Sequence, residues 1–220
     1  MKFKKDFEHK SLSKRVVDYL KEEIFMENYI GGDRIPEAKI AEELEISRAP
    51  VREAFKELEN MGLVETISRK GTFVVDFKKE EVQELYEIRV MLEERVFNIL
   101  IEEEKLNEED FQHLEDLIDE MVDIANSSED QNRKVFEVNK RDIKFHRYLW
   151  CKSDSKWTIR ILTTLYNQLQ LAMILDAKKE ENLVQASLKH KKIINHLKDN
   201  DLKGTKEAVI EHIKTLSQKV

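Results

Sequence analysis

The sequence is poor in cysteine and has no long apolar run. Its single cysteine, Cys151, cannot form an internal disulfide, so a reducing cytoplasm is the expected location. No stretch of about 18 apolar residues is present, which argues against a membrane span. The basic start, "MKFKKDFEHK", lacks the apolar core that a secretory signal requires. We therefore expect a cytoplasmic protein that does not bind a membrane.

Glycine and proline are also scarce, and they are unevenly distributed. The 220 residues include five glycines and two prolines, and after residue 77 only Gly204 remains. Because these residues mark turns, the distribution predicts short elements in the first third and long helices afterwards. We expect a mainly α protein with two domains, residues 1–77 and 78–220, the second being an all-α bundle of about six helices. These helices are expected over residues 79–104, from 107 onward, and over 129–150, 155–177, 182–198 and 205–218.

The surplus of positive charge that is common among nucleic-acid binders is missing. Lys and Arg number 38 against 45 Asp and Glu, which gives a net charge of -7. Any DNA binding must therefore depend on where the positive charges are placed. One such group lies near the N-terminus and could add attraction for phosphates: Lys2, Lys4, Lys5, Lys10, Lys14 and Arg15.

The first domain has the element order of a winged helix-turn-helix. Ser11 or Ser13 can cap a first helix, the turn "IGGDRIP" leads to a second helix with Pro36 at its first position, and Ser47 suits the N-cap of a third helix. This third helix is expected to end near Asn60. The segments "LVETI" and "TFVVDF" alternate apolar and polar residues, as the two strands of a hairpin do. Three helices and a β-hairpin wing are therefore predicted.

Basic side chains recur along one face of the expected third helix. Arg48, Arg52 and Lys56 are spaced by four residues and share that face. Such a helix can enter the major groove, where arginine donates two hydrogen bonds to the O6 and N7 atoms of guanine. The hydroxyl of Ser47 and the helix N-terminus suit a phosphate. The alternative is a solvated stripe, the usual role of charge runs, but the neighbouring helices and hairpin favour DNA recognition.

The tip of the expected hairpin is basic as well. Arg69, Lys70 and Gly71 lie between its two strands. Glycine permits a close approach of the backbone, so this tip is expected to reach the neighbouring minor groove or the phosphate backbone.

The segment "ISRAPVREAFKELENMGLVETISRKGTFV" resembles the winged-helix signature of GntR-type bacterial transcription regulators. The resemblance covers about residues 12–75 and fixes residue types over about thirty positions. Glu45 stands where glycine is usual and Ala49 where threonine often occurs, which leaves the operator sequence open. The resemblance implies DNA contacts by Ser47, Arg48, Pro50, Arg52 and the wing near Gly71.

Three histidines and one aspartate are expected to face the interior of the helical bundle. Asp142 and His146 are four residues apart in "RDIKFHRYL", and His190 and His212 lie on apolar faces of two later helices. Each histidine taken alone suits a hydrogen-bonded core residue. Four ionisable groups buried together, however, require a compensating charge, which a divalent metal ion supplies. Zinc, nickel and manganese all accept neutral imidazoles with a carboxylate.

The segments "DIKFHRYL", "HKKIINHLKDND" and "AVIEHI" are similar to the FCD effector domain of the FadR-type branch of GntR regulators. The resemblance implies that Asp142, His146, His190 and His212 bind a metal ion that helps to hold a small carboxylate effector. "YEIRVMLE" resembles the opening motif of that domain, whose arginine would be Arg89. This arginine could contact the effector carboxylate, and a salt bridge to a neighbouring glutamate is an equal alternative.

Together these features predict a DNA-binding transcription regulator. We expect a homodimer on double-stranded operator DNA, because one winged helix covers only a half-site. We also expect repression that the effector relieves, although no residue distinguishes this from activation. Two alternatives remain at this point: a helical metalloenzyme whose metal activates water, and a DNA-binding protein whose helical domain is purely structural and has no effector.

Overall fold

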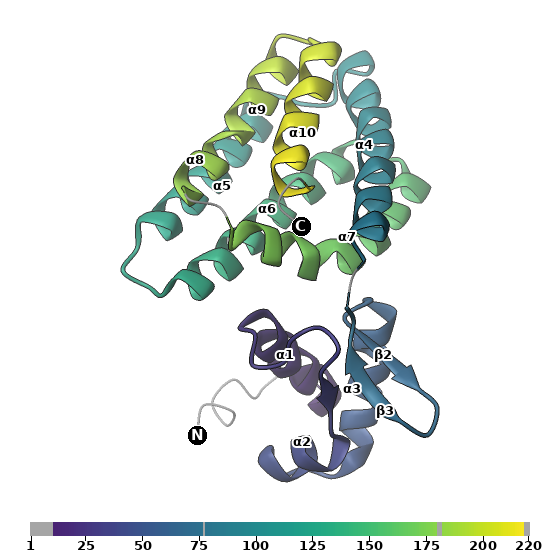
Figure 1. The fold of residues 1–220 in the computed structure, drawn as a ribbon. Helices are drawn as coiled ribbons and strands as arrows, with labels where there is room; N and C mark the ends of the chain where they lie inside the picture. The colour runs from purple at the N-terminus through teal and green to yellow at the C-terminus, as the bar shows by residue number, and fades with distance from the viewer. Residues whose placement is uncertain (1–10, 77, 180–181, 218–220) are drawn as a thin grey trace. The chain divides into compact units, whose positions relative to one another are not determined.

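The computed structural model describes residues 11–76, 78–179 and 182–217, without the side chains of residues 214–217 (Figure 1). Lys2, Lys4, Lys5 and Lys10 lie outside this part of the chain. The chain divides into two compact units, Met1–Phe77 and Lys78–Val220. Among the described residues, no helix is long and apolar enough to cross a membrane.

The first unit is a winged helix-turn-helix, as predicted. Its third helix has a buried stripe of Val51, Ala54, Phe55 and Leu58, and this stripe packs against the first two helices. Burying such side chains stabilises the unit by about 1.5–3 kcal/mol each for the larger ones. The elements of the unit are α1 (Leu12–Phe25), β1 (Arg34–Ile35), α2 (Glu37–Glu43), α3 (Arg48–Asn60), β2 (Val64–Ile67) and β3 (Gly71–Val74).

The wing contains three strands where the sequence predicted two. β2 pairs with β3 as the expected antiparallel hairpin, with Ile67 opposite Gly71. β1 adds to the other edge of β3, with Arg34 opposite Phe73, so the strand order is β1-β3-β2. A strand of two residues is too short to show an alternating pattern, which is why this segment was expected to be only a turn.

The second unit is an all-α bundle, as predicted (Figure 1). α5 packs along α6, and the last helix packs against both α4 and α9. α5 begins with a capping box in which Asn107 and Asp110 bond each other's backbone N–H. The elements are α4 (Lys79–Glu102), α5 (Glu108–Asn126), α6 (Gln131–Lys152), α7 (Lys156–Ala177), α8 (Leu183–Leu188), α9 (His190–Lys198) and α10 (Leu202–Ser217).

Several helix boundaries differ from those expected. The helix predicted over residues 182–198 is interrupted at Lys189, so it forms α8 and α9. α10 begins at Leu202, three residues before the expected start. Pro36 is the N-cap of α2 and precedes the first helical residue, Glu37. Helix ends are the part of a helix that sequence patterns define least.

Candidate functional site

The basic stripe on α3 is exposed to solvent. Arg48, Arg52 and Lys56 are all exposed, while the opposite side of the helix is buried. Ser47 is the N-cap of α3, as expected, but its side chain makes no capping hydrogen bond to the helix. Its hydroxyl and the first N–H groups of α3 therefore remain available to an acceptor such as a phosphate oxygen. Pro50 lies half-buried in the first turn.

One arginine of the stripe is held by a residue from another helix. Arg52 donates from Nε to Oε2 of Glu37 at 2.9 Å, and this hydrogen bond raises the pKa of Arg52 further. Glu37 is the first residue of α2. Among the described residues, Arg48 forms no such ion pair, so the two arginines differ in how firmly they are held.

The tip of the wing is also exposed and basic. Arg69 and Lys70 are exposed in the turn between β2 and β3, and Arg69 has a φ of 63°. Gly71 has a φ of 120°, and a Cβ at this position would lie 2.8 Å from Nε of Arg34. Glycine is therefore favoured at residue 71 by its backbone conformation, and a Cβ there would also displace the end of the flexible Arg34 side chain. Arg34 was not identified from the sequence as part of this surface.

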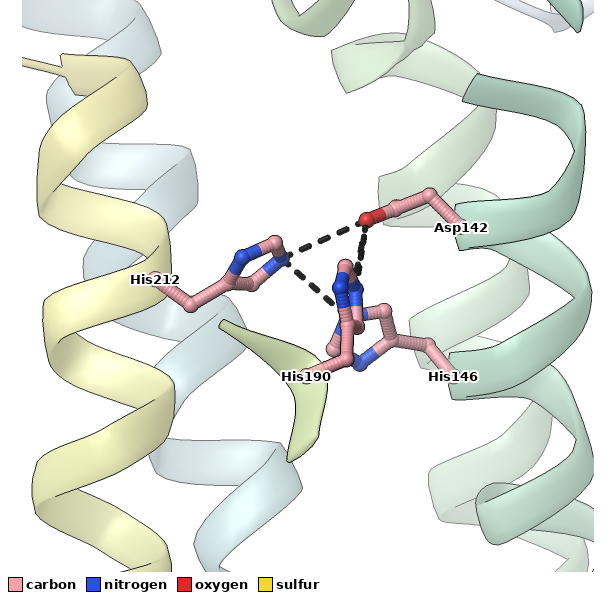
Figure 2. A group of neighbouring side chains, drawn as sticks. All are labelled: Asp142, His146, His190 and His212. Atoms are coloured by element: carbon pink, nitrogen blue, oxygen red, sulfur yellow. Dashed lines mark hydrogen bonds and ion pairs between the residues drawn. The ribbon is translucent and has the colours of Figure 1, made fainter. Parts of the chain in front are cut away.

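In the helical unit, Asp142, His146, His190 and His212 converge on one point (Figure 2). Asp142 and His146 come from α6, His190 from the first turn of α9, and His212 from α10. All four are buried, and one ligand atom from each lies within 4.8 Å of the others. The structure thus brings together the four residues that the sequence singled out.

Three of the separations between these atoms fit donors around a single ion. Oδ1 of Asp142 lies 3.0 Å from Nε2 of His190 and 3.3 Å from Nε2 of His212, and the two Nε2 atoms of His146 and His212 are 3.4 Å apart. An ion about 2.1 Å from each ligand separates neighbouring ligands by about 3.0 Å in octahedral and about 3.4 Å in tetrahedral geometry. Nε2 of His146 and Oδ1 of Asp142 are 3.9 Å apart, which is wider than either value.

A hydrogen bond to the backbone sets the orientation and tautomer of His190. Nδ1 of His190 lies 2.9 Å from the carbonyl oxygen of Ser187, so Nδ1 carries the proton and Nε2 presents its lone pair. That lone pair faces a carboxylate oxygen of Asp142, which is repulsive unless a cation lies between them or the ring is charged. Nδ1 of His146 lies 3.2 Å from Oε1 of Glu93, within ion-pair distance but without a hydrogen bond among the described residues. In addition, Oδ2 of Asp142 has no hydrogen-bond partner among the described residues.

Burial and neighbouring charges set the protonation of the cluster. Burial and the nearby His190 lower the pKa of His212 to about 3, and burial lowers the pKa of His146 as well. Burial raises the pKa of Asp142, but the ring nitrogens of His190 and His212 outweigh it and hold that pKa well below its ordinary value. Neutral imidazoles with an ionised carboxylate are the forms in which these groups bind a divalent metal.

Arg89 is fully buried beside the cluster. Its Nε donates to Oε1 of Glu93 at 3.1 Å, its Nη2 lies 3.0 Å from Nε2 of His146, and its guanidinium carbon lies 4.3 Å from the centre of the Tyr166 ring. Burial raises the pKa of Glu93, but His146 and Arg89 outweigh it and lower it to about 2. Nη1 of Arg89 has no hydrogen-bond partner among the described residues. The salt bridge between Arg89 and a neighbouring glutamate, which was one of the two expected roles, is therefore present. The Nη1 donor of Arg89 is not used by it.

A small cavity adjoins the cluster. Its volume is about 50 Å³, and its lining includes Asp142, His190 and His212. The remaining wall is mainly apolar, with Val138 and Leu183 among its residues. The arrangement as a whole is that of a buried ligand set with a small apolar pocket beside it.

Comparisons with known proteins decide the family. The family model described as "Bacterial regulatory proteins, gntR family" matches residues 12–74, and the model of the FCD domain matches residues 84–215. This chain belongs to the GntR family and carries an FCD domain. The GntR-family proteins are transcription regulators, so the metalloenzyme alternative no longer applies.

Individual relatives agree with this assignment. The GntR-family chain is 28% identical over 194 residues to the uncharacterized HTH-type transcriptional regulator YdhC of Bacillus subtilis, covering 88% of this chain and 84% of YdhC. It is 26% identical over 175 residues to the gluconate operon transcriptional repressor of Bacillus subtilis, covering 77% and 69%. Among solved structures, E. coli McbR/YncC has the same fold with a TM-score of 0.73 at 20% identity, over 96% of this chain and 99% of that one.

The GntR/FCD regulator also contains site residues that the sequence did not single out. Glu93 contacts both Arg89 and His146, and Tyr166 covers the guanidinium of Arg89. The four-residue spacing between Arg89 and Glu93 is a signal that could have identified Glu93. Glu37 gives no comparable signal, because it lies 15 positions before Arg52.

Proposed function

We propose that this GntR/FCD regulator binds operator DNA as a homodimer and that a small carboxylate, bound at a divalent metal ion, controls the binding. Residues 1–77 form the DNA-binding domain, and residues 78–220 form the effector-binding and dimerisation domain. The DNA contacts in this proposal are Ser47, Arg48, Pro50, Arg52, Lys56, Arg69, Lys70 and Gly71. The metal ligands are Asp142, His146, His190 and His212, and Arg89 binds the effector.

The observation that carries the proposal is the convergence of four donor atoms in a buried site next to a cavity. When bound, a zinc, nickel or manganese ion would supply a positive charge and free coordination positions to which a carboxylate can bind. The chain's own residues prepare the site. The carbonyl of Ser187 holds Nδ1 of His190, which directs Nε2 of that ring inward, and Oε1 of Glu93 lies 3.2 Å from Nδ1 of His146.

The size and polarity of the cavity favour a short acid. A cavity of about 50 Å³ corresponds to the room of a few water molecules. Its mainly apolar wall would leave the hydroxyls of a sugar acid without partners, which is costly. Asn139 and Ser187 are the further polar residues of its lining, and Oδ1 of Asn139 is buried without a partner among the described residues. A carboxylate of about two to four carbons with one further hydroxyl fits these features.

Exposed apolar side chains support a dimer formed by the helical unit. Met91 on α4 is 69% exposed and Trp157 on α7 is 72% exposed, and these two helices pack against each other. Ile88 and Ile161 are further exposed apolar residues on the same helices. Large exposed apolar side chains of this kind mark surfaces that bind another protein, and a second copy satisfies the need for two half-sites.

Relatives support repression as the sign of the response. The similar Bacillus subtilis protein is by its name a repressor of a gluconate operon, and a second relative from Paenarthrobacter nicotinovorans is named as a probable repressor of a D-xylose operon. Effector binding would change the population of dimers whose two winged helices fit the operator.

Metal analysis combined with thermal unfolding tests the proposal. Protein purified without chelator is expected to contain one divalent ion per chain, and His146→Ala or His190→Ala to lose it. His113→Ala is the matched control, because His113 is an exposed histidine on α5. Lactate should raise the melting temperature of the metal-loaded protein more than gluconate does. A metal-free wild-type protein would support the alternative of a purely structural helical domain.

A further inference from the structure

The ion pair between Arg52 and Glu37 joins the two helices of the helix-turn-helix. Glu37 lies at the first turn of α2 and Arg52 in the middle of α3, and Nε of the arginine donates to Oε2 of the glutamate at 2.9 Å. The glutamate side chain is 26% exposed and the arginine side chain 65%. The glutamate side chain is thus mostly buried, whereas the arginine side chain is mostly exposed to solvent.

The contact with Glu37 uses only the Nε donor of the Arg52 guanidinium. A free arginine on a helix samples many rotamers, and fixing one of them on DNA costs conformational entropy. The bond from Nε to Glu37 limits these rotamers before DNA is present. It leaves both Nη groups, which are the donors that pair with O6 and N7 of a guanine.

We propose that Glu37 is a positioning residue that sets the sequence specificity of DNA reading by holding Arg52 in a base-reading conformation. The inference rests on the proposed function insofar as α3 reads the DNA. Arg48 provides a contrast, because it is exposed and has no ion pair among the described residues. Arg48 therefore contributes mainly attraction for phosphate, and Arg52 contributes discrimination between bases.

The contributions of this glutamate to stability oppose each other, so stability alone does not account for it. Oε1 of Glu37 is buried without a hydrogen-bond partner among the described residues, and such a group is unfavourable in a fold. An ion pair with an exposed arginine adds little in compensation. The N-terminus of α2 favours an anion at this position, but a carboxylate near DNA also repels phosphates and weakens sequence-independent binding. Glu37 thus decreases general affinity and increases selectivity.

The test compares specific and unspecific DNA binding of the full chain. A duplex is first selected by the wild-type protein from a random pool, and dissociation constants are then measured on this duplex and on a scrambled one. The variants are Glu37→Ala, Glu37→Gln, Arg52→Ala and the double variant Glu37→Ala with Arg52→Ala. Glu53→Gln is the matched control, since it removes one negative charge from α3 at an exposed position that has no ion pair with Arg52 among the described residues.

Glu37→Ala is expected to weaken binding to the selected duplex about tenfold and to leave binding to the scrambled duplex unchanged or tighter. Glu37→Gln, which keeps an acceptor for Nε, should recover part of the specificity. Glu53→Gln should shift both duplexes alike. In the Arg52→Ala background, Glu37→Ala should cause no further loss on the selected duplex.

Two results would overturn the positioning role. In the first, Glu37→Ala weakens binding to the selected duplex by the same factor in the wild-type and the Arg52→Ala backgrounds. In the second, Glu37→Ala keeps the wild-type preference for the selected duplex although Arg52→Ala has lost this preference. Failure of the proposed function is a different result, in which the wild type enriches no sequence or Arg52→Ala binds the selected duplex as tightly as wild type. Thermal unfolding of each variant shows whether a loss of DNA binding reflects a loss of folded protein.

Discussion

His146 and His212 are 66 positions apart in the sequence, yet their Nε2 atoms lie 3.4 Å from each other. The first comes from α6 and the second from α10, and His190 adds α9 to the same point. An ion held there would connect three helices of the FCD domain. Metal and effector binding would then act on the packing of the last two helices as well as on the pocket.

Removal of the metal should therefore lower the stability of the helical domain. An ion present at 100 times its dissociation constant stabilises the folded state by about 2.7 kcal/mol. We expect a chelator to lower the melting temperature of the wild-type protein and an added divalent ion to restore it. His212→Ala should melt at the same temperature with and without chelator, whereas His113→Ala should respond as wild type does. A wild-type melting temperature that is insensitive to chelator would contradict the metal site.

Asp110 makes the stability of the helical domain depend on pH. It is buried at the start of α5 and accepts a hydrogen bond from the Tyr148 hydroxyl at 2.6 Å and an ion pair from Lys152, both on α6. Burial raises the pKa of Asp110, but the bonds from Lys152 and Tyr148 outweigh it and hold that pKa below its ordinary value. The carboxylate therefore stabilises the fold above its unfolded pKa of about 3.9, and this contribution is lost as the pH falls through the folded pKa.

Asp110→Asn should accordingly lower the free energy of unfolding by about 1–3 kcal/mol at pH 7. The difference from wild type should narrow below about pH 4. Urea unfolding at several pH values measures both effects. Asp123→Asn, an exposed position on α5, is the control and should change the free energy by less than about 0.5 kcal/mol. If the difference in the free energy of unfolding between Asp110→Asn and wild type stays constant down to low pH, the charge of Asp110 does not contribute to stability.

Glu45 occupies a backbone conformation that favours glycine. It follows the C-cap Leu44 of α2 and has a φ of 54°, and the N–H of Ile46 closes the turn on the carbonyl of Ala41 at 3.0 Å. A residue with a Cβ in this left-handed region costs about 1 kcal/mol, and glycine is the usual residue just after a helix. The departure from the family signature at this position thus has a local energetic cost.

Glu45→Gly should increase the stability of the winged helix by about 1 kcal/mol. Hydrogen exchange of the backbone amides in α2 and α3 reports this stability separately from that of the helical unit. Glu42→Gly, inside α2, should have the opposite effect and decrease protection by roughly 0.5–1 kcal/mol. Lower protection of these amides in Glu45→Gly than in wild type would mean that the Glu45 side chain stabilises the winged helix by more than its backbone strain costs.

Local patterns in the sequence predicted most of the fold, and they failed where structure depends on distant partners. The apolar periodicity and the caps defined the helices, and the i, i+4 spacing of Asp142 and His146 placed both on one face. The strand β1 has only two residues and is stabilised by β3, almost 40 positions later, so no local pattern indicates it. The contact of Arg89 with His146 spans 57 positions and is likewise invisible to periodicity.

The buried pair of Arg89 and Glu93 allows a direct test of effector binding. Arg89→Met alone leaves an unpaired buried carboxylate and should destabilise the domain by about 3–5 kcal/mol. The double variant Arg89→Met with Glu93→Gln removes both charges and should recover much of this stability. If Arg89 binds the effector, the double variant should still bind metal but show a much smaller thermal shift with lactate. A full lactate shift in the double variant would assign carboxylate binding to the metal alone.

The exposed apolar side chains of α4 and α7 should be necessary for a stable dimer. Replacing Met91 or Trp157 by glutamate introduces a charge into the proposed contact between two copies without disturbing a core, because both side chains are mostly exposed. Central apolar contacts of an interface contribute about 2 kcal/mol or more each, so either variant should weaken the dimer about 30-fold or more. Ile30→Glu, at an exposed apolar residue of the winged helix, is the matched control and should leave the dimer intact. Light scattering across a concentration series measures the dissociation constant, and operator binding should become steeply dependent on protein concentration in the weakened variants. Dimers of unchanged stability in both glutamate variants would locate the contact elsewhere on the chain.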